Sequence, residues 1–343
     1  MAKYGAGVIG LGNVASEYVR AVDNNPLAEV VAVVGRDREK TKNRVQSLGL
    51  SCEVMKEFSD MIARDDIRFV VITTPHYLHF QQIIEAAERG KHVVVEKPIG
   101  MNWQEIARVR EVIVKTGVKF QCGLVLRFNP FVDNLRRLIE TDALGEIFHL
   151  EVDYFHSLRP AWGGFRWGVH KRSGGPSASL VAGIHAVDLL RYLCGEVSEL
   201  TAYSTTASRR EFEYAPSYLA ALRFQSGAIG KSSCSFETRC PYLLNLLLHG
   251  TKGSVFNEKF FLKDLFPGQN AWQRFETVMP DSPAVSHHPF QQLIDDFIEA
   301  VDTDRQTRNN IEEMYRTHEL CLAIDRSMES GERVKLPLSR RIP

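Results

Sequence analysis

The chain has 343 residues, of which 24% are charged and 44% hydrophobic, and its 42 lysines and arginines balance its 42 aspartates and glutamates. This composition is typical of a soluble globular protein, and the length indicates two domains. Zero net charge excludes a global basic field that would attract nucleic acid or an anionic membrane, and no apolar run approaches the roughly 20 residues that span a bilayer. We therefore expect neither partner.

Six cysteines are scattered along the chain, and none forms a C-x-x-C pair or a Cys/His group with zinc spacing. No basic segment followed by an apolar stretch opens the sequence, so we expect no secretory signal. These features predict buried free thiols, no metal site and a reducing, cytoplasmic location.

The first third of the chain alternates short apolar runs with amphipathic stretches. This alternation predicts a parallel sheet covered by helices on both faces, which is a doubly wound dinucleotide-binding domain over residues 1–124. The predicted strands cover residues 7–10, 30–34, 69–73, 92–96 and 119–123. The predicted helices cover residues 14–24, 38–48, 79–89 and 102–116.

The pattern changes after Asn129-Pro130, and residues 125–343 are predicted to form a second α/β domain. Its strand patterns follow one another at turn signals, which favours a mostly antiparallel sheet with a helix packed against it. The predicted strands cover residues 147–155, 200–204, 218–224, 228–236, 243–249 and 254–257. The predicted helices cover residues 130–141, 182–194 and 309–330, and the last is long enough to reach back over the first domain.

A glycine-rich loop follows the first predicted strand. The segment Gly10-Leu11-Gly12-Asn13-Val14-Ala15 fits the pattern G-x-G-x-x-[GA]. Gly10 permits a tight turn, Gly12 lets the backbone approach a pyrophosphate, and Ala15 allows close packing of helix and strand. The helix that follows supplies free amides and a favourable dipole. Because a strand precedes the loop and a helix follows it, we interpret the match as a dinucleotide site rather than as chance.

The second predicted strand ends in Val34-Gly35-Arg36-Asp37. NAD-binding proteins usually carry an acid here for the ribose 2′-OH, whereas NADP-binding proteins often carry a small residue and an arginine. Gly35-Arg36 favours NADP, with Arg36 on the 2′-phosphate. The alternative is that Arg36 and Asp37 are turn residues and that Asp37 serves NAD.

Glu96-Lys97-Pro98 ends the buried run that begins at His92. A lysine at the carboxyl end of a parallel strand points into the crevice where open α/β sheets bind ligands. A nicotinamide beside a proton-transferring amine suggests hydride chemistry, in which Lys97 takes or gives the hydroxyl proton. The alternative is an ordinary lysine paired with Glu96.

Five motifs fall in order along the chain: Gly10-x-Gly12-x-x-Ala15, Thr74-Pro75-His76-Tyr77-Leu78-His79, Glu96-Lys97-Pro98, Arg127-Phe128-Asn129-Pro130 and Gly183-Ile184-His185-Ala186-Val187-Asp188. With them the chain resembles the Gfo/Idh/MocA family, named for glucose–fructose oxidoreductase and inositol dehydrogenase. The resemblance implies a Rossmann domain followed by an α/β domain built on an open, mostly antiparallel sheet. It implies NAD or NADP, a sugar, cyclitol or related polyol as substrate, and homodimers or homotetramers that pair through the open sheet.

The resemblance also implies roles for individual residues. Lys97 is the catalytic lysine, and His185 of the second domain faces it. We expect the cofactor to be held by Gly10, Leu11, Gly12, Asn13, Val14, Arg36, Thr73, Thr74, Pro75, His79, Glu96, Lys97 and Arg127. Read without the resemblance, His185 would be a satisfied core histidine.

One position departs from the family pattern. Many sugar and inositol dehydrogenases of the family carry an aspartate four residues before this histidine, and here Val181 stands there. The missing carboxylate suggests a different sugar pose or a different proton donor.

Further polar and aromatic residues are candidates for substrate contact, because aromatic rings stack on sugars and arginine binds hydroxyls. They are Tyr154, His156, Trp162, Arg166, His170 and Asp188. Packing over the sheet is the alternative for each.

The sequence therefore favours an NAD(P)-dependent dehydrogenase or reductase acting on CH–OH groups. Two alternatives stay open: a redox-neutral enzyme that oxidises a glycoside transiently with bound NAD, and a non-catalytic sensor of the cofactor.

Overall fold

The computed structural model describes residues 3–12, 14–158, 160, 164–277 and 288–338. Its contacts divide the chain into two units. The first comprises Met1–Val125 and Pro280–Tyr315, and the second comprises Leu126–Met279 and Arg316–Pro343. In sequence order, the chain therefore returns to the first unit after passing through most of the second.

The first unit is built on a six-stranded parallel sheet, ordered β3-β2-β1-β4-β5-β6. Val8, Val70 and Val94, in the middle of three central strands, have no exposed surface because helices cover both faces. The predicted doubly wound domain is confirmed, and its strand order changes direction between β1 and β4. The strands are β1 (Tyr4–Ile9), β2 (Ala28–Val34), β3 (Glu53–Met55), β4 (Ile67–Ile72), β5 (His92–Val95) and β6 (Phe120–Cys122).

Helices α1 (Ala15–Asn24), α2 (Arg38–Ser47), α3 (Phe58–Ile62), α4 (His79–Glu88) and α5 (Trp103–Thr116) connect these strands, with a short 3₁₀ turn, η1 (His76–Leu78), before α4. The sequence analysis missed β3 and α3, which are too short to show a period of their own.

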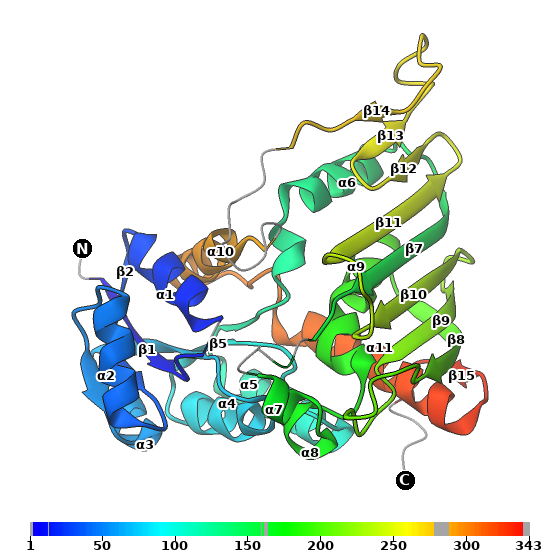
Figure 1. Ribbon diagram of the computed structural model, residues 1–343. Helices are drawn as coiled ribbons and strands as arrows, with labels where there is room; N and C mark the ends of the chain where they lie inside the picture. Colours follow the sequence, from blue (N-terminus) through cyan, green and yellow to red (C-terminus); the bar gives the residue numbers. More distant parts are fainter. Residues whose placement is uncertain (1–2, 13, 159, 161–163, 278–287, 339–343) are drawn as a thin grey trace. The chain divides into compact units, whose positions relative to one another are not determined.

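It also missed α10 (Phe290–Thr303), which belongs to the first unit. Figure 1 shows α10 in orange beside α1 in blue, and the rings of Tyr18 and Phe290 lie 5.1 Å apart. Phe297 of α10 packs on Phe69 of β4 at 5.2 Å between ring centroids. A segment distant in sequence thus covers part of this sheet.

The second unit is built on a nine-stranded sheet, ordered β14-β13-β12-β11-β7-β10-β9-β8-β15. Among the described strands of this sheet, only the β7–β10 pair is parallel, so the predicted mostly antiparallel sheet is confirmed. The strands are β7 (Ile147–Phe155), β8 (Val197–Thr205), β9 (Ser217–Phe224), β10 (Ile229–Ser235), β11 (Leu243–Gly250), β12 (Ser254–Phe256), β13 (Lys259–Phe261), β14 (Gln273–Arg274) and β15 (Val334–Lys335).

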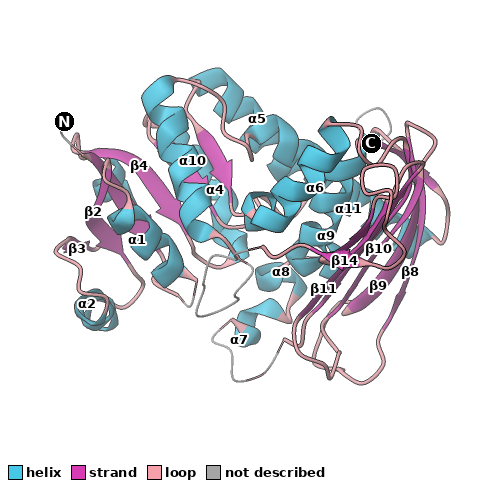
Figure 2. Cartoon of the chain, turned by 90° about the horizontal axis from the view of Figure 1, so that it is seen from above, coloured by secondary structure: helices cyan, strands magenta, loops and turns pink. Residues whose placement is uncertain are grey.

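Helix α9 (Ile184–Cys194) packs on β7 and β10, and the other face of the sheet carries no helix of this unit among the described residues (Figure 2). Side chains of β9 alternate accordingly: Tyr218, Ala220 and Leu222 are buried, while Leu219 is 46% exposed. The remaining helices are η2 (Val125–Phe128), α6 (Pro130–Glu140), α7 (Phe165–Gly168), α8 (Lys171–Gly174), the π-helical η3 (Ser179–Gly183) and α11 (Ile311–Ser330). Across the described residues, no helix is both long and apolar enough to cross a bilayer.

Candidate active site

The glycine loop is held by the ends of three neighbouring strands. Gly10 has a φ of +88°, and its N–H donates to the carbonyl of Val34 at 2.9 Å. A Cβ at Gly10 would lie 2.8 Å from the backbone nitrogen of Thr74. The hydroxyl of Thr73 donates to the carbonyls of Ile9, at 3.3 Å, and Gly10. The protein itself therefore requires glycine at position 10, and Thr73 supports the loop.

Gly12 differs, because a Cβ there would meet no atom of the described chain within 4 Å. Ala15 is fully buried at the start of α1, and Val14, the residue before it, makes no side-chain capping bond in the structure. Open space beside Gly12 and amides at an uncapped helix start fit a pyrophosphate group. These residues therefore suit a dinucleotide. Asn13 lies outside the described residues.

The end of β2 gives a different explanation of the small residue at position 35. A Cβ at Gly35 would collide with the hydroxyl of Thr41 in α2. Asp37 caps α2, accepting the N–H of Lys40 at 3.1 Å, and this backbone bond lowers the pKa of its carboxyl. Arg36 is exposed. Packing explains Gly35, so that glycine carries no information about NADP.

Lys97 follows β5 and is partly exposed, and the Lys97–Pro98 bond is cis. The carboxylate of Glu96, the residue before Lys97, is hydrogen-bonded within the protein. Its Oε1 accepts a hydrogen bond from the Tyr18 hydroxyl at 2.7 Å, and its Oε2 accepts one from the backbone N–H of Lys97 at 3.2 Å. Burial raises the pKa of both Glu96 and Tyr18. A Cβ at Gly123 would collide with the Tyr18 hydroxyl, so this glycine makes room for the pair. These two hydrogen bonds fix the orientation of the Glu96 side chain, directly before Lys97 in the chain.

His79 has no exposed surface, and its two ring nitrogens lie 2.8 Å from the carbonyl oxygens of Thr74 and Pro98. Both ring nitrogens are therefore engaged with backbone carbonyl oxygens of the protein itself. Thr74 itself donates from its hydroxyl to Gln82 at 2.6 Å, and Pro75 beside it is partly exposed, as is Leu11 of the glycine loop.

Arg127 and Asp188 form a buried ion pair in the second unit. Nε and Nη2 of Arg127 donate to the two carboxylate oxygens at 2.8 and 2.6 Å, and Thr317 adds a hydroxyl donor at 2.9 Å. The guanidinium also lies 4.6 Å from the ring centre of Tyr192, and both charged side chains are at most 2% exposed. We expected Arg127 to hold cofactor and Asp188 to contact substrate. A bidentate pair leaves neither charge unmatched, so the two side chains are engaged with each other, and their contacts with cofactor and substrate stay predictions.

His185 lies in the first turn of α9 and is 4% exposed. Its ring stacks on Tyr154 of β7 with centroids 5.0 Å apart and an interplanar angle of 21°. Tyr242 stands edge-on to Tyr154 at 5.0 Å and to His156 at 5.6 Å. The structure therefore brings together three predicted residues, His185, Tyr154 and His156.

Tyr242 was missed. It precedes β11, and the pairing of Leu244 with Tyr154 carries it to this cluster. The sequence offered an aromatic residue before a strand, but not the pairing of that strand. Burial and the neighbouring Tyr154 raise the pKa of Tyr242.

Val181 lies in the π-helical turn that leads into α9 and is 8% exposed. The turn is anchored from α11: Ser177 and Ser179 donate to the two oxygens of Asp325 at 2.7 and 2.5 Å. A Cβ at Gly183 would collide with the hydroxyl of Tyr218. These contacts fix the backbone just before His185.

The remaining substrate candidates lie in another segment. Arg166 of α7 is exposed, and His170 bonds to Glu213 at 2.8 Å with about half of each side chain exposed. Trp162 lies outside the described residues. No group of three potential metal ligands occurs in the part of the chain that is described.

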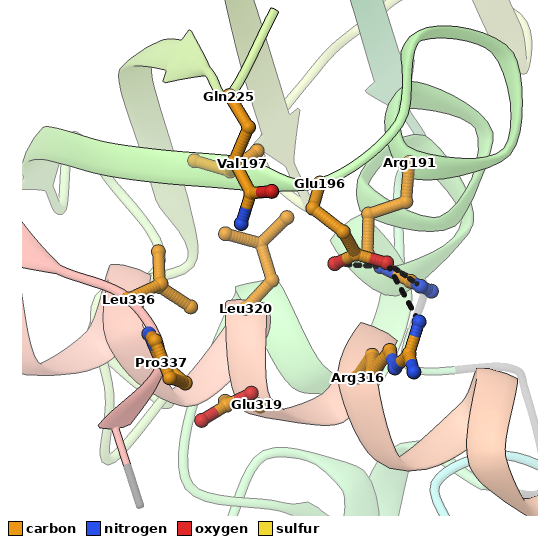
Figure 3. Close-up of a pocket in the computed structure, with 9 residues that line it drawn as sticks. All are labelled: Arg191, Glu196, Val197, Gln225, Arg316, Glu319, Leu320, Leu336 and Pro337. Carbon is orange, nitrogen blue, oxygen red and sulfur yellow. Dashed lines mark hydrogen bonds and ion pairs between the residues drawn. The ribbon is translucent and has the colours of Figure 1, made fainter. Parts of the chain in front are cut away.

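The second unit also contains a cavity of about 200 Å³, which lies apart from the predicted site residues (Figure 3). Arg191 bonds to Glu196 at 2.6 Å and to Thr317 at 2.8 Å, and Arg316 contacts the same glutamate at 3.4 Å. None of the predicted site residues lines this cavity, whose walls are formed by Arg191, Glu196, Val197, Gln225, Arg316, Glu319, Leu320, Leu336 and Pro337.

Comparison with known proteins gives two family matches. The Gfo/Idh/MocA oxidoreductase model, described as an NAD-binding Rossmann fold, matches residues 4–124. The model of the Gfo/Idh/MocA C-terminal domain matches residues 132–256. The first match spans the six-stranded sheet, and the second spans β7 to β12 of the nine-stranded sheet.

Three similar proteins illustrate the range of chemistry. A 2,7-anhydro-N-acetylneuraminate hydratase of Mediterraneibacter gnavus is 29% identical over 204 residues, which are 58% of this chain and about half, 51%, of that protein's length. A scyllo-inositol 2-dehydrogenase (NAD⁺) of Bacillus subtilis is 27% identical over 73% of this chain and 72% of its own. The solved structure of the WlbA dehydrogenase of Bordetella pertussis, in complex with NADH and UDP-GlcNAcA, is 27% identical with a TM-score of 0.83, over 98% of this chain and 99% of that one.

Proposed function

This chain belongs to the Gfo/Idh/MocA family of NAD-binding oxidoreductases, and on that premise we propose that it moves a hydride between nicotinamide and a carbinol or ketone of a sugar, cyclitol or related polyol. The observation that carries this proposal is the position of Lys97. It follows β5, two strands from the β1 glycine loop at the same edge of a parallel sheet.

When bound, the nicotinamide supplies or accepts the hydride. The chain must then handle the hydroxyl proton, because oxidising a carbinol releases it and reducing a ketone consumes it. We assign Lys97 as the acid/base at this atom and His185 as the second group on the substrate side. Tyr154 stacks on the His185 ring and holds its orientation.

For the cofactor, Gly10 and Thr73 shape the loop while Gly12 leaves room for the pyrophosphate. We propose NAD(H), the cofactor of two of the similar proteins, the scyllo-inositol 2-dehydrogenase (NAD⁺) and the WlbA dehydrogenase in complex with NADH. The preference for NADP that Gly35-Arg36 favoured has no support in the structure, since Thr41 accounts for Gly35. A role for Arg36 in recognising a 2′-phosphate stays a testable prediction.

A second candidate function is favoured by Val181 and by the similarity to a hydratase. In a redox-neutral reaction of this kind, a glycoside would be oxidised transiently and reduced again with the same cofactor, so there would be no net redox change. We regard a cofactor-sensing protein without catalysis as disfavoured, because both Lys97 and His185 are present.

The deciding experiment follows nicotinamide absorbance with a panel of sugars and cyclitols, both with and without added NAD(P). Substrate-dependent reduction or oxidation supports the dehydrogenase, and product formed without added cofactor supports the redox-neutral reaction.

Lys97→Ala is then expected to lower turnover by about 100- to 10,000-fold while leaving cofactor affinity intact. His185→Ala is expected to weaken both substrate binding and turnover. Near-normal turnover of Lys97→Ala would refute the assignment of the proton to Lys97.

We also propose that the protein is a homodimer or homotetramer assembled through the helix-free face of the nine-stranded sheet. Exposed Tyr203, Leu219, Ile229 and Leu243 lie on this face, around an ion cluster in which Lys231 contacts Glu151 at 2.8 Å. Exposed apolar side chains on one sheet face are typical of an interface. We also propose a cytoplasmic location, in keeping with six cysteines that form no disulfide in the structure.

A further inference from the structure

His79 is a buried imidazole whose two ring nitrogens both lie close to backbone carbonyl oxygens. Its Nδ1 lies 2.8 Å from the carbonyl of Pro98, in the loop that carries Lys97, and its Nε2 lies 2.8 Å from the carbonyl of Thr74, in the loop that follows β4. The ring has no exposed surface. A single side chain at the start of α4 therefore joins two loops that leave neighbouring strands, β4 and β5.

The other side of Lys97 is already held, since Glu96 bonds to Tyr18 and to the N–H of Lys97. The contact of His79 with Pro98 fixes the backbone immediately after the lysine. With Glu96 before it and Pro98 after it tied to different elements, the backbone of Lys97 has little freedom to move.

We infer that His79 is a positioning residue, which holds the Lys97 loop against the loop of Thr73 and Thr74 and so sets where the lysine amine stands at the cofactor edge of the sheet. This inference rests on the proposed function of Lys97. It gives His79 a role through Lys97 in place of the direct cofactor contact that the sequence suggested.

The protonation of the ring matters to this bridge. A neutral imidazole carries one N–H and donates to one carbonyl, whereas a ring protonated at both nitrogens donates to both. Burial lowers the pKa of His79 and the charge of Lys97 adds to this, while the two carbonyls raise it. The ring of His76, 5.7 Å away between centroids, is a further titratable neighbour.

Two substitutions separate donation from ring packing. His79→Phe keeps a planar ring but removes every ring N–H that could donate to the carbonyls of Thr74 and Pro98, whereas His79→Gln retains a donor. The matched control is Gln82→Leu on the same helix, which removes a bond to the Thr74 hydroxyl and leaves the bridge to Pro98 in place.

The first readout needs no substrate. The protein is reductively methylated with ¹³C-formaldehyde, and the Lys97 signal is assigned by its loss in Lys97→Arg. We expect this signal to shift or broaden in His79→Phe, less so in His79→Gln, and to stay unchanged in Gln82→Leu. NADH affinity, measured by fluorescence, should stay within about threefold of wild type in all three. An unmoved Lys97 signal in His79→Phe would overturn the inference. If the phenylalanine variant does not fold, a Lys97 signal in His79→Gln identical to that of wild type would overturn it instead.

The second readout uses the substrate found by the sugar panel. His79→Phe should lower kcat by about tenfold or more with KM little changed, because the fault lies in the placement of the amine, and His79→Gln should recover part of the loss. Unchanged kcat in His79→Phe would also contradict the inference. If no sugar turns over, the proposed function fails while the NMR result still decides whether His79 positions Lys97.

Discussion

The hydroxyl of Tyr18 donates a 2.7 Å hydrogen bond to Oε1 of Glu96, 78 positions further along the chain. Tyr18 belongs to the first helix, and Glu96 directly precedes Lys97. The bond therefore links the helix of the glycine loop to the residue before the proposed acid/base. Gly123 completes the arrangement, since any side chain there would displace the phenol.

Removing this phenol should destabilise the first unit. Tyr18→Phe is expected to lower the free energy of unfolding by about 1–3 kcal/mol, because it leaves a buried carboxyl without one of its donors. Urea unfolding measures the difference. An unchanged midpoint would show that another donor replaces the phenol.

The two loop glycines should fail in different ways. Gly12→Val is expected to abolish NAD binding in a protein of normal stability, since a Cβ at this position would meet no atom of the described chain within 4 Å. Gly10→Ala should instead cost about 1–3 kcal/mol of stability, because an L-residue is strained at its φ of +88°. Calorimetric titration and thermal unfolding distinguish the two, and normal NAD binding by Gly12→Val would remove the loop from the cofactor site.

Arg36 tests cofactor choice. If it meets a 2′-phosphate, one charge-assisted contact is worth about 1.5–3 kcal/mol, so Arg36→Ala should weaken NADP(H) by about tenfold or more and leave NAD(H) little changed. Parallel titrations with both cofactors decide this. Equal, small effects on the two would place Arg36 outside the site.

Asp325 predicts a pH dependence of stability. Burial raises its pKa from 3.8 to about 6, so folding favours the protonated acid. Its contribution is fully present below pH 3.8 and is lost as the pH rises to about 6. Asp325→Asn, which stays neutral, should remove about 1–3 kcal/mol of this pH dependence. Urea unfolding of both proteins between pH 4 and 7 checks the slope, and parallel curves would contradict the assignment.

The assembly proposal is tested by mass. Light scattering should give a multiple of the 38.8 kDa chain, and Leu219→Glu on the helix-free sheet face should shift the mass toward one chain. Val114→Glu, at an exposed position of α5 in the first unit, is the matched control and should leave the mass unchanged. A wild-type mass of 38.8 kDa would refute the proposal.

Local pattern was sufficient for much of this molecule. Continuous apolar strands between amphipathic helices predict a covered parallel sheet, and successive strand patterns separated by turn signals predict the mostly antiparallel second sheet. The glycine loop and Lys97 were found in the same way, because each depends on residues adjacent in sequence at the end of a strand.

The tertiary structure alone decided which side chains are already engaged. Arg127 and Asp188, 61 positions apart, neutralise each other, and His79 faces two carbonyls rather than open space. Tyr242 joins His185 through the pairing of β11 with β7, and α10 returns to a sheet formed some 200 residues earlier in the chain. A period of 2 or 3.6 residues reports which face of an element is buried, but it carries no information about the partner that buries it, since that partner is set by packing between segments distant in sequence.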